Sequence, residues 1–321
     1  MFNTRKGFGM LFQDVFSEFL ERKKIKIKRS TVDLYERLYE KHFMFFKDME
    51  IEDFTPSTVD NWISYLHCKN RNKQRLSFDH ELTLLKIIVN YYWDQHDCKL
   101  DIFKKRHTEN VIVKIKDKKI SKELPEEEFN LFLHWLSILY GEKYTMLAII
   151  QYYQALRISE AIAVHYNDFK LDYQNPFNSS LTIQRSVVFS HRTDKESYLQ
   201  DGFKNGDIKV QPVIPQVYFY LKDRLDKYTD QYLFIEDKIP EFYKIKNAYT
   251  KAFRRAGLPY SSTHILRHGG CSRLFNISGG NIIIASQILG NTQQETIKTY
   301  AHGYNNSLKN FTNSLWDKLE K

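Results

Sequence analysis

Apolar side chains in the first third of the chain recur three and four residues apart, which is the spacing of one helix face. The segment LTLLKIIVNYYW, residues 82–93, is apolar on most faces, so its helix is predicted to be the buried centre of a small bundle. N-capping residues, and a proline in a first helical turn, mark where helices begin. The pattern predicts helices over residues 11–23, from Ser30 or Thr31 to about Met49, from Thr55-Pro56 onward, and from about Arg75 to Gln95.

The pattern changes at residues 104–122, KKRHTENVIVKIKDKKISK, which are rich in lysine and have no helical period. They predict an interdomain linker, which can lie along a polyanion or simply be solvated. Three glutamates after Pro125 then predict a helix start, because acidic side chains are favoured at the positive end of the helix dipole. We therefore expect a helical domain over residues 1–106, a basic linker over 107–120 and a second domain over 121–321.

The second domain has a mixed pattern. Residues 125–140 and 143–156 predict helices, and residues 159–166 a short one. LTIQRSVVF, residues 181–189, is rich in β-branched side chains and predicts a strand. A second strand is predicted to end near Lys204, with Asn205-Gly206 as a hairpin turn, a return strand over 208–214, and helices from about Gln216 onward. The expected fold class is mainly α with a small β-sheet (α+β), arranged as a two-domain clamp.

Composition adds a partner class to this picture. The 321 residues suit two domains, and a formal net charge of +9 favours a polyanion such as nucleic acid, although a merely lysine-rich protein has the same charge. The three cysteines lie far apart, which indicates a reducing compartment and no disulfide framework. Neither a secretory signal nor a membrane span is recognisable, so a cytoplasmic protein is expected.

Basic residues gather at the ends of the predicted N-terminal helices. They predict a surface that contacts phosphates, and a solvated face is the alternative. The candidates for DNA contact are Lys24, Lys26, Lys28, Arg71, Lys73 and Arg75.

Nucleotide and metal motifs are missing from the sequence: there is no P-loop, no G-x-G-x-x-G, no H-E-x-x-H and no paired cysteine set. His264 and His268 lack a third ligand nearby, so no metal and no other cofactor is expected. His264 and Arg267 lie three residues apart, which places them on one helix face, and together they suit an anionic oxygen. Arg157 follows an apolar helix at a helix junction, where Glu160 can orient it or form an ordinary ion pair with it.

The order and spacing of these residues resemble the tyrosine recombinase (phage integrase) family. Residues 155–164, ALRISEAIAV, are similar to its box G-L-R-x-x-E-x-x-x-L, and residues 264–268 match its H-x-L-R-H. Leu289-Gly290-Asn291, followed after eight residues by Tyr300, fits its third box, L-G-H and a tyrosine. Asn291 departs from the family pattern, which has histidine or sometimes tryptophan there. The family also has a lysine at a hairpin turn, followed by a basic residue and a proline. Lys204, then Lys209 and Pro212, resemble this pattern.

The resemblance implies the chemistry of DNA strand exchange without metal or ATP. It implies that Tyr300 attacks the scissile phosphodiester to form a 3′-phosphotyrosyl link, and that a four-way junction follows. Lys195 and Lys209 are alternatives to Lys204 as the general acid. The implied roles are phosphate binding by Arg157, Arg267 and Asn291, acceptance or relay of the tyrosine proton by His264, general acid catalysis by Lys204, and orientation of part of the set by Glu160.

The same resemblance implies partners. They are double-stranded DNA with an inverted-repeat core site, three further copies of the chain in a tetramer on DNA, and an accessory directionality factor. An apolar stripe at helical spacing within residues 306–320 predicts either packing on its own domain or docking on a neighbouring protomer. Three other functions compete: a type IB topoisomerase, a non-catalytic accessory protein in which Asn291 marks lost activity, and a basic scaffold protein.

Overall fold

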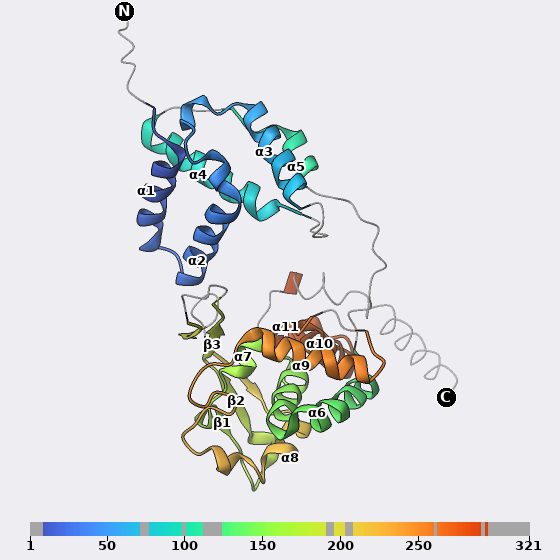
Figure 1. Cartoon of the computed structure of the whole chain (residues 1–321). Coiled ribbons are helices and arrows are strands. Elements are labelled where there is room, and N and C mark those ends of the chain that lie inside the picture. Colours follow the sequence, from blue (N-terminus) through green and yellow to red (C-terminus); the bar gives the residue numbers. More distant parts are fainter. Residues whose placement is uncertain are drawn as a thin grey trace, which may run out of the picture. The chain divides into compact units, whose positions relative to one another are not determined.

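A computed structural model of the chain describes residues 9–70, 77–97, 101–111, 124–190, 196–202, 208–259, 262–289 and 293–294. The chain divides into two compact units, Met1–Lys118 and Lys119–Lys321 (Figure 1). Each unit has its own hydrophobic core of buried side chains. No helix among the described residues is both long enough and apolar enough to cross a bilayer.

The first unit is a helical bundle around α4. The predicted buried helix is confirmed, because Leu85, Ile88 and Val89 of α4 are fully buried. The predicted N-cap is confirmed as well: the Thr58 amide donates to Oγ1 of Thr55 at 3.2 Å, directly before Pro56. The helices are α1 (Phe12–Lys24), α2 (Arg29–Leu38), α3 (Pro56–Lys69), α4 (Asp79–His96) and α5 (Lys105–Asn110).

The second predicted helix ends earlier than expected. It was predicted to continue to about Met49, but α2 stops at Leu38 and is followed by a π-helical turn and a 3-10 turn. These wider and tighter turns rotate both Phe43 and Phe46 into the core, where their rings lie 5.5 and 5.4 Å from that of Trp62.

The predicted linker begins too early. Residues 105–110 were expected to lack helix, but they form α5 and pack on α3. His107 is fully buried, with Nε2 at 3.1 Å from Oδ1 of Asp60, and Val111 is fully buried in the first core. A six-residue helix with one buried face is too short to give a hydrophobic period, which is why the sequence did not show it.

The second unit is built around α6 (Glu126–Tyr153), which packs against α9 (Phe242–Arg255) and α10 (His264–Ile277). The two helices predicted over 125–140 and 143–156 are two arms of α6, joined at Gly141, whose φ of +75° breaks the helix. Figure 1 shows α6, α9 and α10 gathered on one side of the unit and the strands on the other. The remaining helices are α7 (Ile158–Ile162), α8 (Pro215–Leu221) and α11 (Ile282–Leu289).

Two small antiparallel sheets complete the second unit. One has the order β1 (Phe169–Lys170), β2 (Ser180–Ile183), β5 (Lys209–Pro212), and the other pairs β3 (Arg185–Val188) with β4 (Tyr198–Asp201). The strand predicted over 181–189 therefore divides at Gln184, whose Nε2 donates to Oδ1 of the buried Asp168 at 2.6 Å. β5 pairs with β2, not with the strand that precedes it along the chain. The α+β fold class is confirmed.

Candidate active site

Arg157 and Glu160 are held by the start of α7. After α6 ends at Tyr153, the chain turns through residues 154–156, and Arg157 becomes the N-cap of α7. Glu160, in the first turn, accepts a hydrogen bond from the Arg157 backbone amide at 2.8 Å, as a capping-box glutamate does. The same carboxylate accepts one from Nη1 of Arg157, also at 2.8 Å. The Glu160 carboxylate thus contacts both the backbone and the side chain of Arg157, which fits either of the two predicted relations.

Arg267 reaches the same carboxylate from α10. Its Nη1 donates to the backbone carbonyl of Ala155 at 3.0 Å and lies 3.5 Å from Oε2 of Glu160. The Arg267 and Glu160 side chains are only 7% and 4% exposed, whereas that of Arg157 is 41% exposed. One buried carboxylate therefore joins two arginines that lie 110 residues apart in the sequence. Two guanidinium groups held this way suit a phosphate better than isolated surface arginines do.

A strained turn and two glycines bring these segments together. Ala155 is fully buried and has a φ of +52°, a conformation that L-residues other than glycine rarely adopt. On α10, Gly270 lies so close to the end of α6 that an added Cβ would be 1.9 Å from the Tyr152 carbonyl oxygen. At Gly269 an added Cβ would be 2.7 Å from the Leu124 carbonyl oxygen. The absence of side chains here allows α10 to approach α6 closely enough for Arg267 to reach Ala155.

Two buried glutamines, Gln151 in α6 and Gln154 directly after it, bond the segments that precede α10 and α8. Nε2 of Gln151 donates to the carbonyl of Thr263, directly before α10, at 2.9 Å, and Oε1 accepts from the Tyr249 hydroxyl at 3.2 Å. Nε2 of Gln154 donates to the Pro212 carbonyl at 3.2 Å, and Oε1 accepts from the Ile214 amide at 2.9 Å. The sequence analysis did not identify either residue. Their signal was two polar side chains, three residues apart, in the otherwise apolar run LAIIQYYQAL.

His264 begins α10 one turn before Arg267, as its spacing predicted. The residue is exposed, although surrounding groups partly desolvate its ring. This desolvation, together with the positive charges of Arg267 and Arg157, holds the pKa of His264 below its usual value. The imidazole is therefore neutral near pH 7, so it can accept a proton.

Known proteins share the fold of this chain. Residues 11–67 match the family described as phage integrase, N-terminal SAM-like domain. Among solved structures, the Tn1549 transposon integrase in complex with transposon right end DNA matches with a TM-score of 0.69 and 19% identity, over 95% of this chain and 99% of that one. XerH site-specific recombinase bound to difH substrate matches with a TM-score of 0.55 and 15% identity, over 85% and 75%. A search of curated proteins by sequence finds no match.

The chain shares its two-domain fold with the Tn1549 integrase and the XerH recombinase. The matched structures span both units, so the resemblance drawn from the sequence boxes is confirmed at the level of the fold.

Four of the predicted residues lie together in the second unit: Arg157, Glu160, His264 and Arg267. Leu289, the first residue of the predicted third box, ends α11. Other predicted residues lie outside the described part of the chain, namely Lys204, Asn291, Tyr300, Arg71, Lys73 and Arg75.

Three predicted DNA-contact residues of the first unit are described. Lys24 ends α1 and its Nζ lies 2.5 Å from Oε1 of Glu21, while Lys26 and Lys28 lie in the connection to α2. Lys24 and Lys26 are exposed and Lys28 is half-buried. The basic cluster also lies at the negative end of the α1 dipole, which by itself favours lysine and arginine at those positions.

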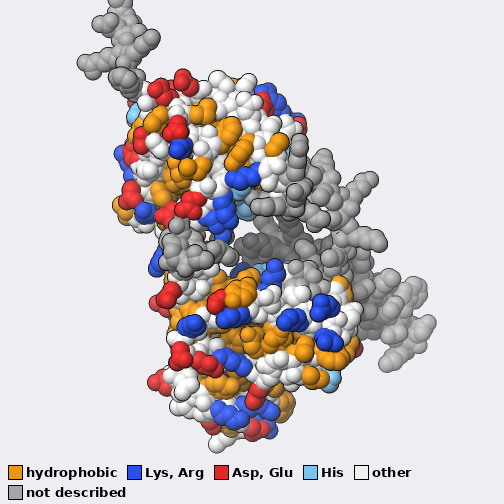
Figure 2. All heavy atoms as spheres, viewed as in Figure 1, with side chains coloured by type: hydrophobic (Ala, Val, Ile, Leu, Met, Phe, Trp, Pro, Cys, Tyr) orange, Lys and Arg blue, Asp and Glu red, His pale blue; other side chains and the backbone are white. Residues whose placement is uncertain are grey.

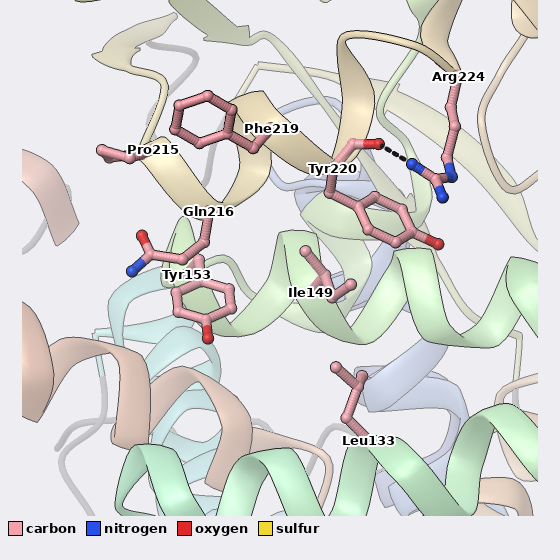
Figure 3. A pocket seen from close by; sticks show the side chains of 8 residues that line it. All are labelled: Leu133, Ile149, Tyr153, Pro215, Gln216, Phe219, Tyr220 and Arg224. Atoms are coloured by element: carbon pink, nitrogen blue, oxygen red, sulfur yellow. Dashed lines mark hydrogen bonds between the residues drawn. The ribbon is translucent and has the colours of Figure 1, made fainter.

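The second unit also has an apolar hollow of about 580 Å³ between α6 and α8 (Figure 3). Nη1 of Arg224 at its edge donates to the Tyr220 carbonyl at 3.0 Å. The residues that line it include none of Arg157, Glu160, His264 and Arg267. On the face shown in Figure 2, the Lys and Arg side chains of this unit are scattered among apolar side chains and do not form one basic patch. The candidate chemistry therefore lies with the arginines and not in this hollow.

Proposed function

We propose that the protein is a site-specific DNA recombinase that cuts and rejoins DNA through a 3′-phosphotyrosyl intermediate and a four-way junction. The observation that carries the proposal is the buried Glu160 carboxylate, which holds Arg157 and Arg267 together. Two preorganised guanidinium groups can neutralise charge as it develops on the non-bridging oxygens of a phosphate. The fold shared with an integrase and a recombinase that were both solved with DNA supports the same substrate class.

The proposed first step is attack by Tyr300 on the scissile phosphodiester. The bond between the tyrosine oxygen and phosphorus forms while the bond from phosphorus to the 5′-oxygen breaks. His264 accepts the phenolic proton, since free tyrosine has a pKa of about 10 and needs a base near neutrality. Lys204 gives a proton to the departing 5′-oxygen. Asn291 donates a hydrogen bond to a phosphate oxygen, as an amide can, but carries no charge.

The covalent link preserves the energy of the phosphodiester, so the proposed reaction needs neither ATP nor a metal. Attack by the 5′-hydroxyl of a partner strand reverses the chemistry and completes the exchange. Repetition on the second pair of strands resolves the four-way junction.

The proposed partner is double-stranded DNA with an inverted-repeat core site. The first unit, which includes α5 and Val111, is its DNA-binding domain, and the second unit is the catalytic domain. The matched Tn1549 integrase and XerH structures contain DNA, which supports this choice. An accessory directionality factor is the further proposed partner. The DNA-contact residues of the first unit are then Lys24, Lys26, Lys28, Arg71, Lys73 and Arg75.

Strand exchange needs four active sites, so we propose a homotetramer on DNA, joined through the C-terminal segment 306–321. Deletion of residues 306–321 is expected to abolish recombination and assembly on DNA while DNA binding by the monomer remains. Normal recombination by the truncated protein would exclude this role for the segment.

Covalent trapping in cells tests the proposed function. The wild-type protein and Tyr300→Phe are expressed, denatured and captured, and any attached DNA is sequenced. DNA attached to the wild type but not to the variant is expected, and its ends give the cleavage site. If both proteins bind DNA but neither traps it, the accessory-protein function is favoured. Relaxation of supercoiled DNA without strand exchange would favour a topoisomerase.

A further inference from the structure

Lys209 lies on the inner face of the three-stranded sheet. It is paired with Ile183 of β2, and paired residues of neighbouring strands share one face. Ile183 is 2% exposed, and Gln211, two residues farther along the same face of β5, is 3% exposed. Val210, which lies between them in sequence, is 65% exposed and faces the other side. The Lys209 side chain therefore points toward the interior of the second unit.

The inward position brings this lysine to the two arginines. Burial and the charge of Arg267, followed by smaller effects that include the charge of Arg157, lower the pKa of Lys209 to about 8, while Glu160 and Cys271 oppose the shift. An ammonium is strongly hydrated, so placing one beside two guanidinium groups in a half-buried position lowers stability. Fold stability does not explain such a residue, and groups perturbed in this way concentrate at functional sites.

The strand that carries Lys209 is fixed to the segment that carries Arg157. Gln154 bonds the Pro212 carbonyl and the Ile214 amide, and Nε2 of Gln211 donates back to the Gln154 carbonyl at 3.2 Å. These three hydrogen bonds connect β5 and the residues after it to the turn before Arg157. Lys209 is thus held relative to Arg157 by the backbone and not only by its own flexible side chain.

We propose that Lys209 is a further catalytic cation of this site, one that contacts a non-bridging oxygen of the scissile phosphate beside Arg157 and Arg267. The proposal rests on the recombinase function proposed above. With Lys209 protonated, three cations face one carboxylate, Glu160, which leaves two positive charges in excess. A phosphodiester under attack by a tyrosinate carries two negative charges, so the site matches its transition state.

This role differs from acid catalysis, which is assigned to Lys204. A cation that neutralises a non-bridging oxygen is needed whatever group leaves. A proton donor is needed only when the leaving group is a strong base. A DNA substrate with sulfur in place of the 5′-bridging oxygen separates the two, because a thiolate leaves without protonation.

The decisive variant is Lys209→Met in the full-length protein, with Lys209→Arg as the charge-retaining partner. Lys170→Met, an exposed lysine at the edge of the same sheet, is the matched control. Single-turnover cleavage is measured on the site recovered by trapping, with oxygen or sulfur at the 5′ position. We expect Lys209→Met to slow cleavage of both substrates by about a hundredfold, as loss of one preorganised donor does. Lys209→Arg is expected to recover part of the rate.

Thermal unfolding separates catalysis from structure. Replacing a half-buried charge with an apolar side chain of similar length is expected to leave the melting temperature unchanged or to raise it. A lower melting temperature that accounts for the slow cleavage would assign Lys209 a structural role and overturn the proposal. Cleavage by Lys209→Met within threefold of the wild-type rate would overturn it as well. So would a defect that the sulfur substrate removes, since that result identifies a proton donor.

Inorganic phosphate provides a readout that does not depend on cleavage. We expect phosphate to raise the melting temperature of the wild type and of Lys170→Met, and to raise that of Lys209→Met distinctly less. If the wild type traps no DNA but this difference is present, the anion site stands and the recombinase function fails. Equal shifts in all three proteins would overturn the assignment of Lys209 to the phosphate site.

Discussion

The carbonyl oxygen of Ala155 accepts a hydrogen bond from Nη1 of Arg267 at 3.0 Å, and Ala155 makes this contact with a φ of +52°. The left-handed backbone turns the Ala155 carbonyl toward α10. If α6 continued as a helix instead, this carbonyl would point along α6. The local strain is thus coupled to the position of a proposed catalytic arginine.

Substitutions at Ala155 should show this coupling. Ala155→Val is expected to lower the free energy of unfolding by about 2 kcal/mol or more, because a β-branched side chain is strongly disfavoured in the left-handed region. Ala155→Gly fits that region and is expected to stay within about 1 kcal/mol of the wild type, since the relieved strain offsets the lost methyl burial. Urea unfolding of both variants measures the difference. Equal stability of the valine and glycine variants would contradict the strained turn.

The contact between α6 and α10 predicts an unusual sign at Gly270. A change from glycine to alanine inside a helix normally stabilises it by about 1 kcal/mol. Here the added Cβ would meet the Tyr152 carbonyl oxygen, so Gly270→Ala is expected to destabilise by about 2 kcal/mol and to reduce DNA cleavage by displacing Arg267. Asn276→Ala, at an exposed position of the same helix, should change stability by less than about 0.5 kcal/mol. A stabilised Gly270→Ala protein would show that the helices do not approach this closely.

The carboxylate of Glu160 predicts a defect that an anion can repair. Glu160→Gln leaves the Arg267 guanidinium without its buried counter-charge, and we expect a loss of about 2–4 kcal/mol in the free energy of unfolding. Inorganic phosphate should stabilise this variant more than the wild type, because it replaces the missing negative charge.

The matched control is Glu142→Gln, which removes an exposed ion pair with Arg224 at 3.0 Å and should cost less than about 1 kcal/mol. If phosphate stabilised Glu160→Gln no more than the control, the two arginines would not form an anion site.

The lowered pKa of His264 predicts a pH dependence. The pKa of His264 in the folded chain lies below the ordinary value of 6.5. As the pH falls, the unfolded chain therefore binds a proton at this residue before the folded chain does. The wild type should therefore lose stability relative to His264→Gln as the pH falls below about 6.5, and the difference should level off below the folded-state pKa. Urea unfolding between pH 7.5 and 5 measures this difference. Parallel curves would mean that neither desolvation nor the neighbouring Arg157 and Arg267 acts on His264.

Local features of the sequence predicted much of the fold. Helical periods and the Thr55-Pro56 cap gave most helices, because both signals depend on neighbours within one or two turns. The pairing of β5 with β2 was not predicted, since strand partners are set by contacts between residues far apart in sequence. A short helix such as α5 gives too few positions for a period.

The candidate site shows the same limit. The resemblance to the tyrosine recombinase boxes identified Arg157, Glu160, His264 and Arg267 as a set, because their order and spacing follow those boxes. Spacing did not reveal that Ala155 is strained, since alanine is a helix former and gives no turn signal. It also named Lys209 only as an alternative, because its inward direction depends on the register with Ile183.

Gln154 has a consequence for how the second unit unfolds. Its side-chain amide bonds both the end of β5 and the residue before α8, and its backbone carbonyl accepts from Gln211. The sheet cannot separate from the end of α6 without breaking all three hydrogen bonds in a buried environment. Strand and helix should therefore open as one cooperative unit, with the backbone amides of β5 exchanging with solvent as slowly as those at the end of α6.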